Sequence, residues 1–165
     1  MNAGAYDREI RDVAVSTTAF EHGAGIFTVK GEEHDFSYRS SRFSDTGDII
    51  LSSALRLEKG DAKKIREKMS DLQTRRRGSQ PLELPSAGSV FKRPKEGYAA
   101  ALIEQAGLKG FSIGGAQVST MHSGFIVNRG GAAFADVMAV IEYVREAVFK
   151  QCGIVLETEI KIIRG

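Results

Sequence analysis

Three polar residues at break points of the chain have side chains suited to acid–base or carboxylate chemistry. Ser89 lies in the loop-like string PSAGSVFKRP, where Lys92 and Arg93 add positive charge. Arg39 lies in DFSYRSSRF, and its planar guanidinium is suited to holding a carboxylate through two parallel hydrogen bonds. Glu159 stands on the polar side of an alternating C-terminal segment. Together they would supply an acid (Ser89), a clamp for a bound carboxylate (Arg39) and a carboxylate of the protein's own (Glu159).

Each of these residues also has a plainer explanation. A serine beside glycine often bonds its own backbone in a turn, and residue types alone favour that role for Ser89. A lone arginine such as Arg39 is more often a surface residue. Alternating charges such as Glu157, Glu159 and Lys161 usually face solvent. The residues alone do not show that the three side chains meet in space.

Other kinds of site have no sequence support. Cys152 is the only cysteine, and the three histidines have no metal-ligand spacing. No glycine-rich nucleotide fingerprint or Walker loop is present. We therefore expect neither a disulfide nor a metal site.

Charge and hydropathy point to a soluble protein. The net charge of +2, from 23 basic and 21 acidic residues, gives no overall reason to bind nucleic acid. The basic run Arg75–Arg77 ends a predicted helix, where cations complement the helix dipole. With no membrane-length apolar run and no signal layout, we expect a cytoplasmic location and no membrane partner.

The elements that must position these residues form an α+β pattern. Short strands are predicted at 13–15, 25–30 and 49–57, punctuated by glycines. Asp61 is a good N-cap for a helix that carries apolar residues at helical spacing and ends near Gly78. The following Ser79-Gln80-Pro81 is the best candidate for a domain boundary.

The rest of the chain predicts two helices and two strands. Helices are expected at 98–105 and from Phe134 to about Gly153, the longer one with an apolar face. A short strand is expected at 124–127, and a final alternating strand at 154–163. We therefore expect units at 1–78 and 79–153, with residues 154–165 returning to the first.

Several longer strings, in order, resemble the UDP-N-acetylenolpyruvoylglucosamine reductase family. These strings are NAGAY, YRSSRF, PSAGSVFKRP, LIEQAGLKGFSIGGAQVS, HSGFIVN and LETEI. The resemblance covers nearly the whole chain and is closest to the family's compact subgroup, which lacks an extra loop over the substrate. It implies part of an FAD-binding subdomain of the vanillyl-alcohol-oxidase kind at 1–78, then a small α+β substrate-binding domain.

The resemblance also implies a reaction and the residues that perform it. NADPH would reduce bound FAD, and the flavin would reduce UDP-N-acetylglucosamine enolpyruvate to UDP-N-acetylmuramate for peptidoglycan. Ser89 matches the family's proton donor, Arg39 its substrate-carboxylate arginine and Glu159 its catalytic glutamate. The remaining implied contacts are to FAD from Asn2, Gly4, Ala5 and Tyr6, and to substrate from Tyr38, Arg39, Lys92 and Arg93.

Two departures from the family shape what we expect of this chain. Ser40 stands where the family usually has aspartate, which changes the support of Arg39. The family's first FAD-binding subdomain has no counterpart here, so we expect a truncated reductase that loses flavin and self-associates through its first unit. The alternatives are a flavin-free UDP-sugar-binding module and a non-catalytic remnant.

Overall fold

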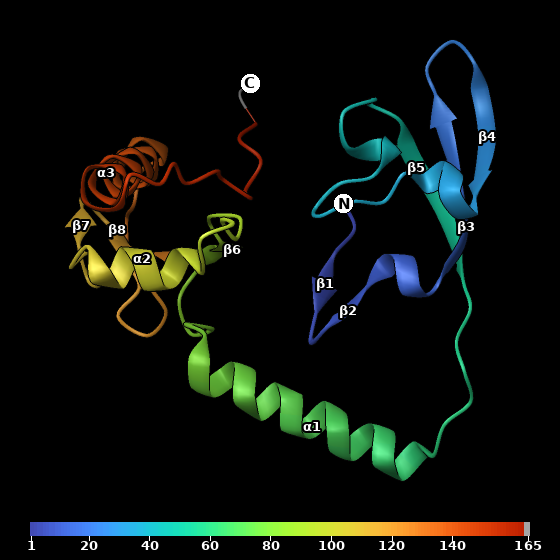
Figure 1. The fold of residues 1–165 in the computed structure, drawn as a ribbon, viewed down its shortest axis with the longest axis horizontal. Helices are drawn as coiled ribbons and strands as arrows, with labels where there is room; N and C mark the ends of the chain where they lie inside the picture. Colours follow the sequence, from blue (N-terminus) through green and yellow to red (C-terminus); the bar gives the residue numbers. More distant parts are fainter. Residues whose placement is uncertain (164–165) are drawn as a thin grey trace. The chain divides into compact units, whose positions relative to one another are not determined.

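The computed structural model describes residues 1–163 and has an α+β architecture (Figure 1). The chain divides into two compact units, Met1–Asp61 and a second that begins at Ala62. Each unit is described by itself. In chain order the elements are β1 (Gly4–Ala5), β2 (Arg8–Glu9), η1 (Ile10–Asp12), β3 (Ala14–Glu21), β4 (Gly25–Lys30), η2 (Gly31–His34), η3 (Arg42–Ser44), β5 (Ile49–Leu55), α1 (Ala62–Ser79), β6 (Ser86–Ser89), α2 (Ala99–Gln105), β7 (Ser112–Ile113), β8 (Ala116–Val118), β9 (Phe125–Asn128) and α3 (Phe134–Cys152).

The first unit is built on a three-stranded antiparallel sheet in the order β4-β3-β5. The short hairpin β1–β2 precedes it. Ala19 and Val29 are buried where β3 pairs with β4, and the η2 residue His34 is buried as well. The His34 ring bonds the Gly31 carbonyl through Nδ1 (2.9 Å) and Thr17 Oγ1 through Nε2 (3.0 Å). A histidine satisfied at both nitrogens ties the short helix to the sheet.

Much of the apolar surface of this sheet is uncovered. Every residue of the edge strand β5 is exposed, including Ile49, Ile50, Leu51 and Leu55. Ile26 on the opposite edge strand β4 is 70% exposed. An exposed apolar edge strand is a surface that favours association with another chain.

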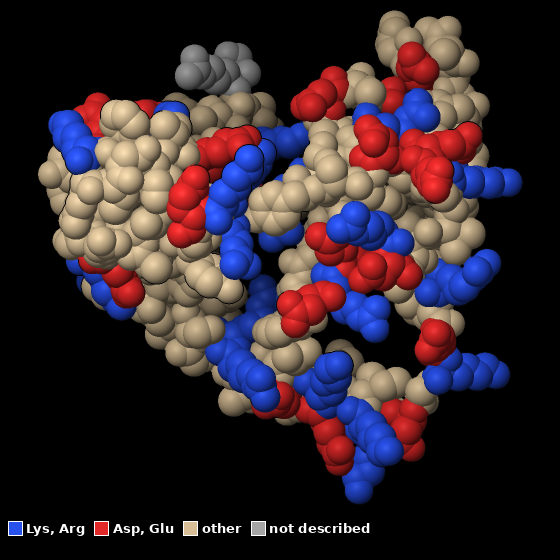
Figure 2. Space-filling view, in the orientation of Figure 1, with Lys and Arg blue, Asp and Glu red and all other residues tan. Residues whose placement is uncertain are grey.

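Helix α1 matches its predicted start and end but buries none of its residues. The predicted apolar stripe is present, yet Ile65 and Met69 are both exposed. The helix carries seven Lys and Arg against Glu67 and Asp71, and Figure 2 shows basic side chains crowded along this stretch. Its solvent-facing surface is therefore strongly basic. Arg75 and Asp71 form an ion pair at 2.9 Å.

The second unit packs α2 and α3 against a four-stranded antiparallel sheet in the order β6-β9-β8-β7 (Figure 1). Val140, Ile141, Val144 and Val148 of α3 are fully buried. They pack with Ala116, Val118 and Ile126 of the sheet in one apolar cluster. This confirms the predicted helix with an apolar face, which ends as expected at Gly153 in the left-handed conformation (φ 70°).

The C-terminal segment differs from the strand predicted at 154–163. It contains no strand and instead runs along the residues that follow β6, with a single bridge between Thr158 and Phe91. Leu156 is completely buried in the cluster of the second unit, and Arg145 of α3 donates to the Leu156 carbonyl at 3.2 Å. Apolar residues of this segment thus pack against the core of the second unit, Leu156 completely buried and Ile154 and Ile160 partly buried, without forming a sheet strand.

The division into units also differs from the sequence expectation. We predicted a boundary after residue 78 and a final segment that joins the first unit. By contacts the boundary follows Asp61, so α1 and the C-terminal segment both group with the second unit. The physical reason for the second difference is burial, because Leu156 completes the core beneath α3.

Candidate functional site

Ser89 is the last residue of β6, and its side chain is exposed. Gly88 precedes it with φ +84°, a conformation that glycine adopts without strain. Ser89 pairs with Phe125 of β9, and the Val90 amide donates to the Gly124 carbonyl at 2.8 Å. The strand end is therefore held on one side while the hydroxyl remains accessible.

Glu159 lies next to this strand end. Its amide donates to the Val90 carbonyl at 2.7 Å, so its backbone is adjacent to the residue that follows Ser89. Its side chain is half-buried. The fold thus brings together two of the three predicted catalytic residues, Ser89 and Glu159.

Arg39 belongs to the first unit, at the tip of a tight turn. Ser37 and Ser40 close the turn with two backbone hydrogen bonds of 3.2 Å each. Arg39 has φ +54°, and its guanidinium carbon lies 5.0 Å from the centre of the Tyr38 ring. Stacking on Tyr38 orients the guanidinium. A fixed orientation is one requirement for binding a carboxylate through two parallel hydrogen bonds.

Ser40, where the resemblance led us to expect an aspartate, supports a neighbouring element. Its hydroxyl donates to Ser44 Oγ of η3 at 3.2 Å. The Ser44 hydroxyl in turn accepts from the Ser41 amide at 2.9 Å. The serine therefore stabilises the start of η3.

The four predicted flavin contacts lie at the N-terminal hairpin, and they have unequal roles. The buried Asn2 side chain donates to Glu9 Oε2 (2.9 Å) and the Ser37 carbonyl (3.3 Å), and accepts from the Arg11 amide (3.0 Å). A Cβ at Gly4 would lie 2.9 Å from the Arg8 carbonyl oxygen. Asn2 and Gly4 therefore build the hairpin, whereas Ala5 and Tyr6 are exposed at its turn, with Tyr6 at φ +54°.

The predicted substrate cations of the second unit are already engaged. Lys92 forms an ion pair with Glu157, and its amide donates to the Glu157 carbonyl at 2.8 Å. The Arg93 guanidinium carbon lies 4.1 Å from the centre of the Tyr98 ring. These contacts orient both cations near the end of β6, and a substrate anion would compete with Glu157 for Lys92.

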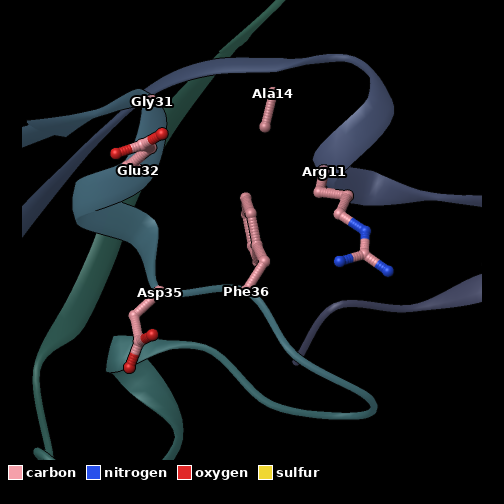
Figure 3. A pocket seen from close by; sticks show the side chains of 6 residues that line it. All are labelled: Arg11, Ala14, Gly31, Glu32, Asp35 and Phe36. Carbon is pink, nitrogen blue, oxygen red and sulfur yellow. The ribbon is translucent and has the colours of Figure 1, made fainter.

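One cavity of about 380 Å³ lies in the first unit (Figure 3). The Phe36 ring points into it, with Arg11 on one side and Glu32 and Asp35 on the other. Arg11 is paired with Glu9 at 2.6 Å, so the net charge that faces the cavity is negative. The arrangement suits a planar group better than a phosphate.

A smaller cavity of about 160 Å³ lies in the second unit, between the segment 80–84 and the sheet. Its walls are mainly apolar, from residues such as Leu82, Met121 and Val127, and Arg77 and Arg129 line it as well. The Arg129 guanidinium donates to Gln117 Oε1 at 3.4 Å. Glu83 lines the cavity as well, so its charged groups are two cations and one carboxylate.

A carboxylate near the β8–β9 turn shows a perturbed pKa. The hydrogen bond and the charge of Lys109 lower the pKa of Glu104 below its ordinary value, and His122 acts in the same direction. Among residues 1–163, no group of three or more His, Cys, Asp or Glu side chains could hold a metal ion. No helix within this range is long and apolar enough to cross a membrane.

Two residues beside Ser89 were not predicted from the sequence. A Cβ at Gly124 would lie 3.4 Å from Ser89 Oγ and 3.0 Å from His122 Cε1, so both side chains border the same narrow space. His122 Nδ1 accepts from the Gly124 amide at 3.1 Å. The sequence signal that could have indicated them is HSGF. There the histidine stands two residues before the glycine, so its side chain can bond the glycine amide in a turn.

Comparison with known proteins identifies the family. Residues 80–163 match the family model for the C-terminal domain of UDP-N-acetylenolpyruvoylglucosamine reductase. The chain belongs to the UDP-N-acetylenolpyruvoylglucosamine reductase family. The expected resemblance is thereby confirmed.

Relatives and a solved structure agree with this family over nearly the full chain. The chain is 50% identical to the reductase of Pediococcus pentosaceus and 47% identical to that of Caldanaerobacter subterraneus, in each case over 163 residues. These matches cover 99% of this chain but 54% of each relative. The crystal structure of UDP-N-acetylenolpyruvylglucosamine reductase from Thermus caldophilus superposes with a TM-score of 0.84 at 34% identity, over 98% of this chain and 57% of that one. The chain thus spans about half the length of the curated relatives it matches.

Proposed function

We propose that this chain supplies the substrate-binding and proton-donating part of a UDP-N-acetylenolpyruvoylglucosamine reductase. The observation that carries the proposal is the accessible Ser89 hydroxyl beside the Glu159 backbone, within the region that matches the family's C-terminal domain. The substrate would be UDP-N-acetylglucosamine enolpyruvate, and the product UDP-N-acetylmuramate for peptidoglycan. A cytoplasmic location is part of the same proposal.

The roles of the chain's own residues follow from their chemistry. Ser89 would give its proton to the carbon that carries negative charge once hydride has added to the other carbon of the enolpyruvyl double bond. Arg39, stacked on Tyr38, would stabilise the substrate carboxylate as that charge develops. Glu159, whose amide donates to the Val90 carbonyl, would supply the catalytic carboxylate that the family resemblance implies. Lys92 and Arg93 would attract the substrate's diphosphate near the end of β6.

The cofactors that the family resemblance implies are FAD and NADPH, and FAD would supply hydride to the substrate. The N-terminal hairpin tests whether the described residues fit a flavin dinucleotide. The Asn2 side chain donates to Glu9 and to the Ser37 carbonyl and accepts from the Arg11 amide. The Arg8 carbonyl oxygen lies so close to Gly4 that there is no room for a Cβ there. That leaves the turn residues Ala5 and Tyr6 on the surface, which do not amount to a pyrophosphate cradle. The described residues of this hairpin therefore do not by themselves hold a flavin dinucleotide.

A second candidate function is a flavin-free module that binds UDP-sugars. The second unit supports it, because that unit has its own apolar core, its own cavity and both predicted substrate cations. Such a module would bind substrate without reducing it.

A ligand titration of the purified chain tests the binding part of both candidates. UDP-N-acetylglucosamine enolpyruvate should shift backbone NMR signals of residues near the end of β6, including Ser89 and Lys92. Arg93→Ala should weaken binding, and Lys63→Ala, on the exposed helix α1, should leave it unchanged. Absence of any signal change at millimolar ligand would contradict the proposal.

A further inference from the structure

The C-terminal segment is bonded on one side to the residues that follow Ser89. The Lys92 amide donates to the Glu157 carbonyl at 2.8 Å. Two residues further along the segment, the Glu159 amide donates to the Val90 carbonyl at 2.7 Å. These two bonds set which residue of the segment lies beside which residue of 90–92. The place of the Glu159 backbone therefore depends on how firmly the segment is held.

Helix α3 holds the segment on its other side through Arg145. The Arg145 side chain donates from Nε to the Leu156 carbonyl at 3.2 Å. The Leu156 side chain is completely buried in the apolar cluster of the second unit. The carbonyl that Arg145 bonds belongs to the peptide group that links Leu156 to Glu157. Arg145 thus fixes the backbone immediately before the first residue bonded to 90–92.

The Arg145 guanidinium is itself oriented by Glu142, one turn earlier on α3. Arg145 Nη1 donates to both carboxylate oxygens of Glu142, at 3.0 and 3.1 Å. A guanidinium is planar and rigid, so a fixed Nη1 also fixes the direction in which the Nε–H group points. Glu142 is exposed and Arg145 is half-buried. An ion pair this exposed adds little to stability, so its main effect here is to orient the donor to the Leu156 carbonyl.

We infer that Arg145, oriented by Glu142, is a positioning residue for Glu159. It holds the Leu156 carbonyl, and the segment from there to Glu159 keeps its place along residues 90–92. The importance of this position for catalysis rests on the proposed role of Glu159. The hold that α3 has on the segment is a property of the second unit alone.

The same helix carries a matched control. Glu146 and Lys150 form an ion pair at 3.8 Å, and both residues are exposed. This pair joins two residues of α3 to each other, as the pair of Glu142 and Arg145 does. A substitution at Glu146 therefore reports what the loss of a surface ion pair on α3 does to the unit.

Amide hydrogen exchange of the whole chain, followed by NMR, tests the inference. Arg145→Met keeps an unbranched apolar stem and removes the donors. Protection of the Glu159 amide should fall about 3- to 10-fold, the range that corresponds to one hydrogen bond. Protection of the Val118 amide, in the sheet, should not change. Glu142→Ala should give a smaller loss at Glu159, and Glu146→Ala should give none.

The double variant that combines Glu142→Ala with Arg145→Met tests the order of the chain. If Glu142 acts through the guanidinium, the loss at Glu159 should equal that of Arg145→Met alone. Additive losses would contradict the role given to Glu142. Unchanged protection of Glu159 in Arg145→Met would overturn the inference. An equal loss at Val118 would overturn it as well, because it would mark a general loss of stability.

Kinetics of an intact reductase with this sequence give a second readout. Arg145→Met should lower kcat and leave KM for UDP-N-acetylglucosamine enolpyruvate nearly unchanged, because a displaced catalytic carboxylate affects the transition state more than substrate binding. A rise in KM with kcat unchanged would contradict the link to Glu159. Failure of the wild-type chain to bind this substrate would remove the proposed function. The exchange rates would still decide whether Arg145 holds the segment.

Discussion

At the scale of single residues, Ser89 combines an exposed hydroxyl with a strand end held by Gly124 and Glu159. In an intact reductase with this sequence, Ser89→Ala should leave flavin reduction by NADPH nearly unchanged, because that step needs no proton from serine. Transfer to the enolpyruvyl substrate should slow by roughly 10²–10⁴-fold, the usual contribution of a general acid. Stopped-flow absorbance of the flavin separates the two half-reactions.

The Ser89 prediction has an internal control. Ser89→Cys should retain part of the activity, because a thiol can also give up a proton. The loss in Ser89→Ala should appear in turnover more than in substrate affinity, since the hydroxyl acts on charge formed during the reaction. Equal slowing of both half-reactions would contradict the proposed role of Ser89 as proton donor.

Glu104 and Lys109 give a second residue-scale prediction. Lys109 lowers the pKa of Glu104, so the ion pair stabilises the fold above the ordinary pKa of a glutamate and loses that contribution as pH falls through the lowered value. Lys109→Ala should raise the Glu104 pKa towards its ordinary value. Carboxyl ¹³C chemical shifts followed from pH 7 to pH 2 measure this directly. Lys150→Ala, on α3, is the control and should leave Glu104 unchanged.

At the scale of elements, Leu156 is the most deeply buried side chain of the C-terminal segment, and Ile154 and Ile160 pack partly buried against the same cluster. Leu156 is fully buried under α3, whereas its neighbour Val155 is largely exposed. Leu156→Ala should reduce the free energy of unfolding by about 2–5 kcal/mol, the range for a buried leucine truncated in a core. Val155→Ala should change it by less than about 0.5 kcal/mol. Urea unfolding of both variants, monitored by circular dichroism, measures the difference.

The same substitution should disturb the site locally. Glu159 is held to Val90 by one backbone bond three residues beyond Leu156. In Leu156→Ala, the amide of Glu159 should therefore exchange faster than that of Val118, which lies in the sheet. Equal acceleration of both amides would mean that the segment unfolds only with the whole unit.

At the scale of the whole molecule, we expect the purified chain to be largely free of FAD. Of the four predicted flavin contacts, only Ala5 and Tyr6 are exposed, and the chain spans 54% of the length of its first relatives. The absorbance spectrum of the purified protein should lack the visible bands of a flavin. Near-stoichiometric bound flavin would contradict this expectation.

We also expect the chain to self-associate through its first unit. β5 is an edge strand that is exposed along its length, and Ile26 adds apolar surface on the other edge. Light scattering at several concentrations should show an apparent mass that rises with concentration. Leu51→Lys should lower this association, and Val155→Lys, exposed in the second unit, should leave it unchanged. An unchanged monomer mass across concentrations would refute the expectation.

Local patterns in the sequence were enough to predict the helices, the β4 strand and the α+β class. Helical spacing and caps report on neighbours three or four residues away, so α1, α2 and α3 could be predicted nearly to the residue. The strings around Ser89 and Arg39 pointed to the family and to both residues. None of this required knowledge of which segments meet.

Only the tertiary structure decided which residues surround Ser89. The register of β6 on β9 sets Gly124 and His122 beside it, and the burial of Leu156 brings Glu159 to Val90. The same burial turned the predicted final strand into an anchored segment of the second unit. Alternation along 154–163 shows which side chains avoid water, but the apolar cluster that receives Leu156 is built from segments distant in sequence. Contacts of that kind depend on how the whole unit fills its core, and no local pattern encodes them.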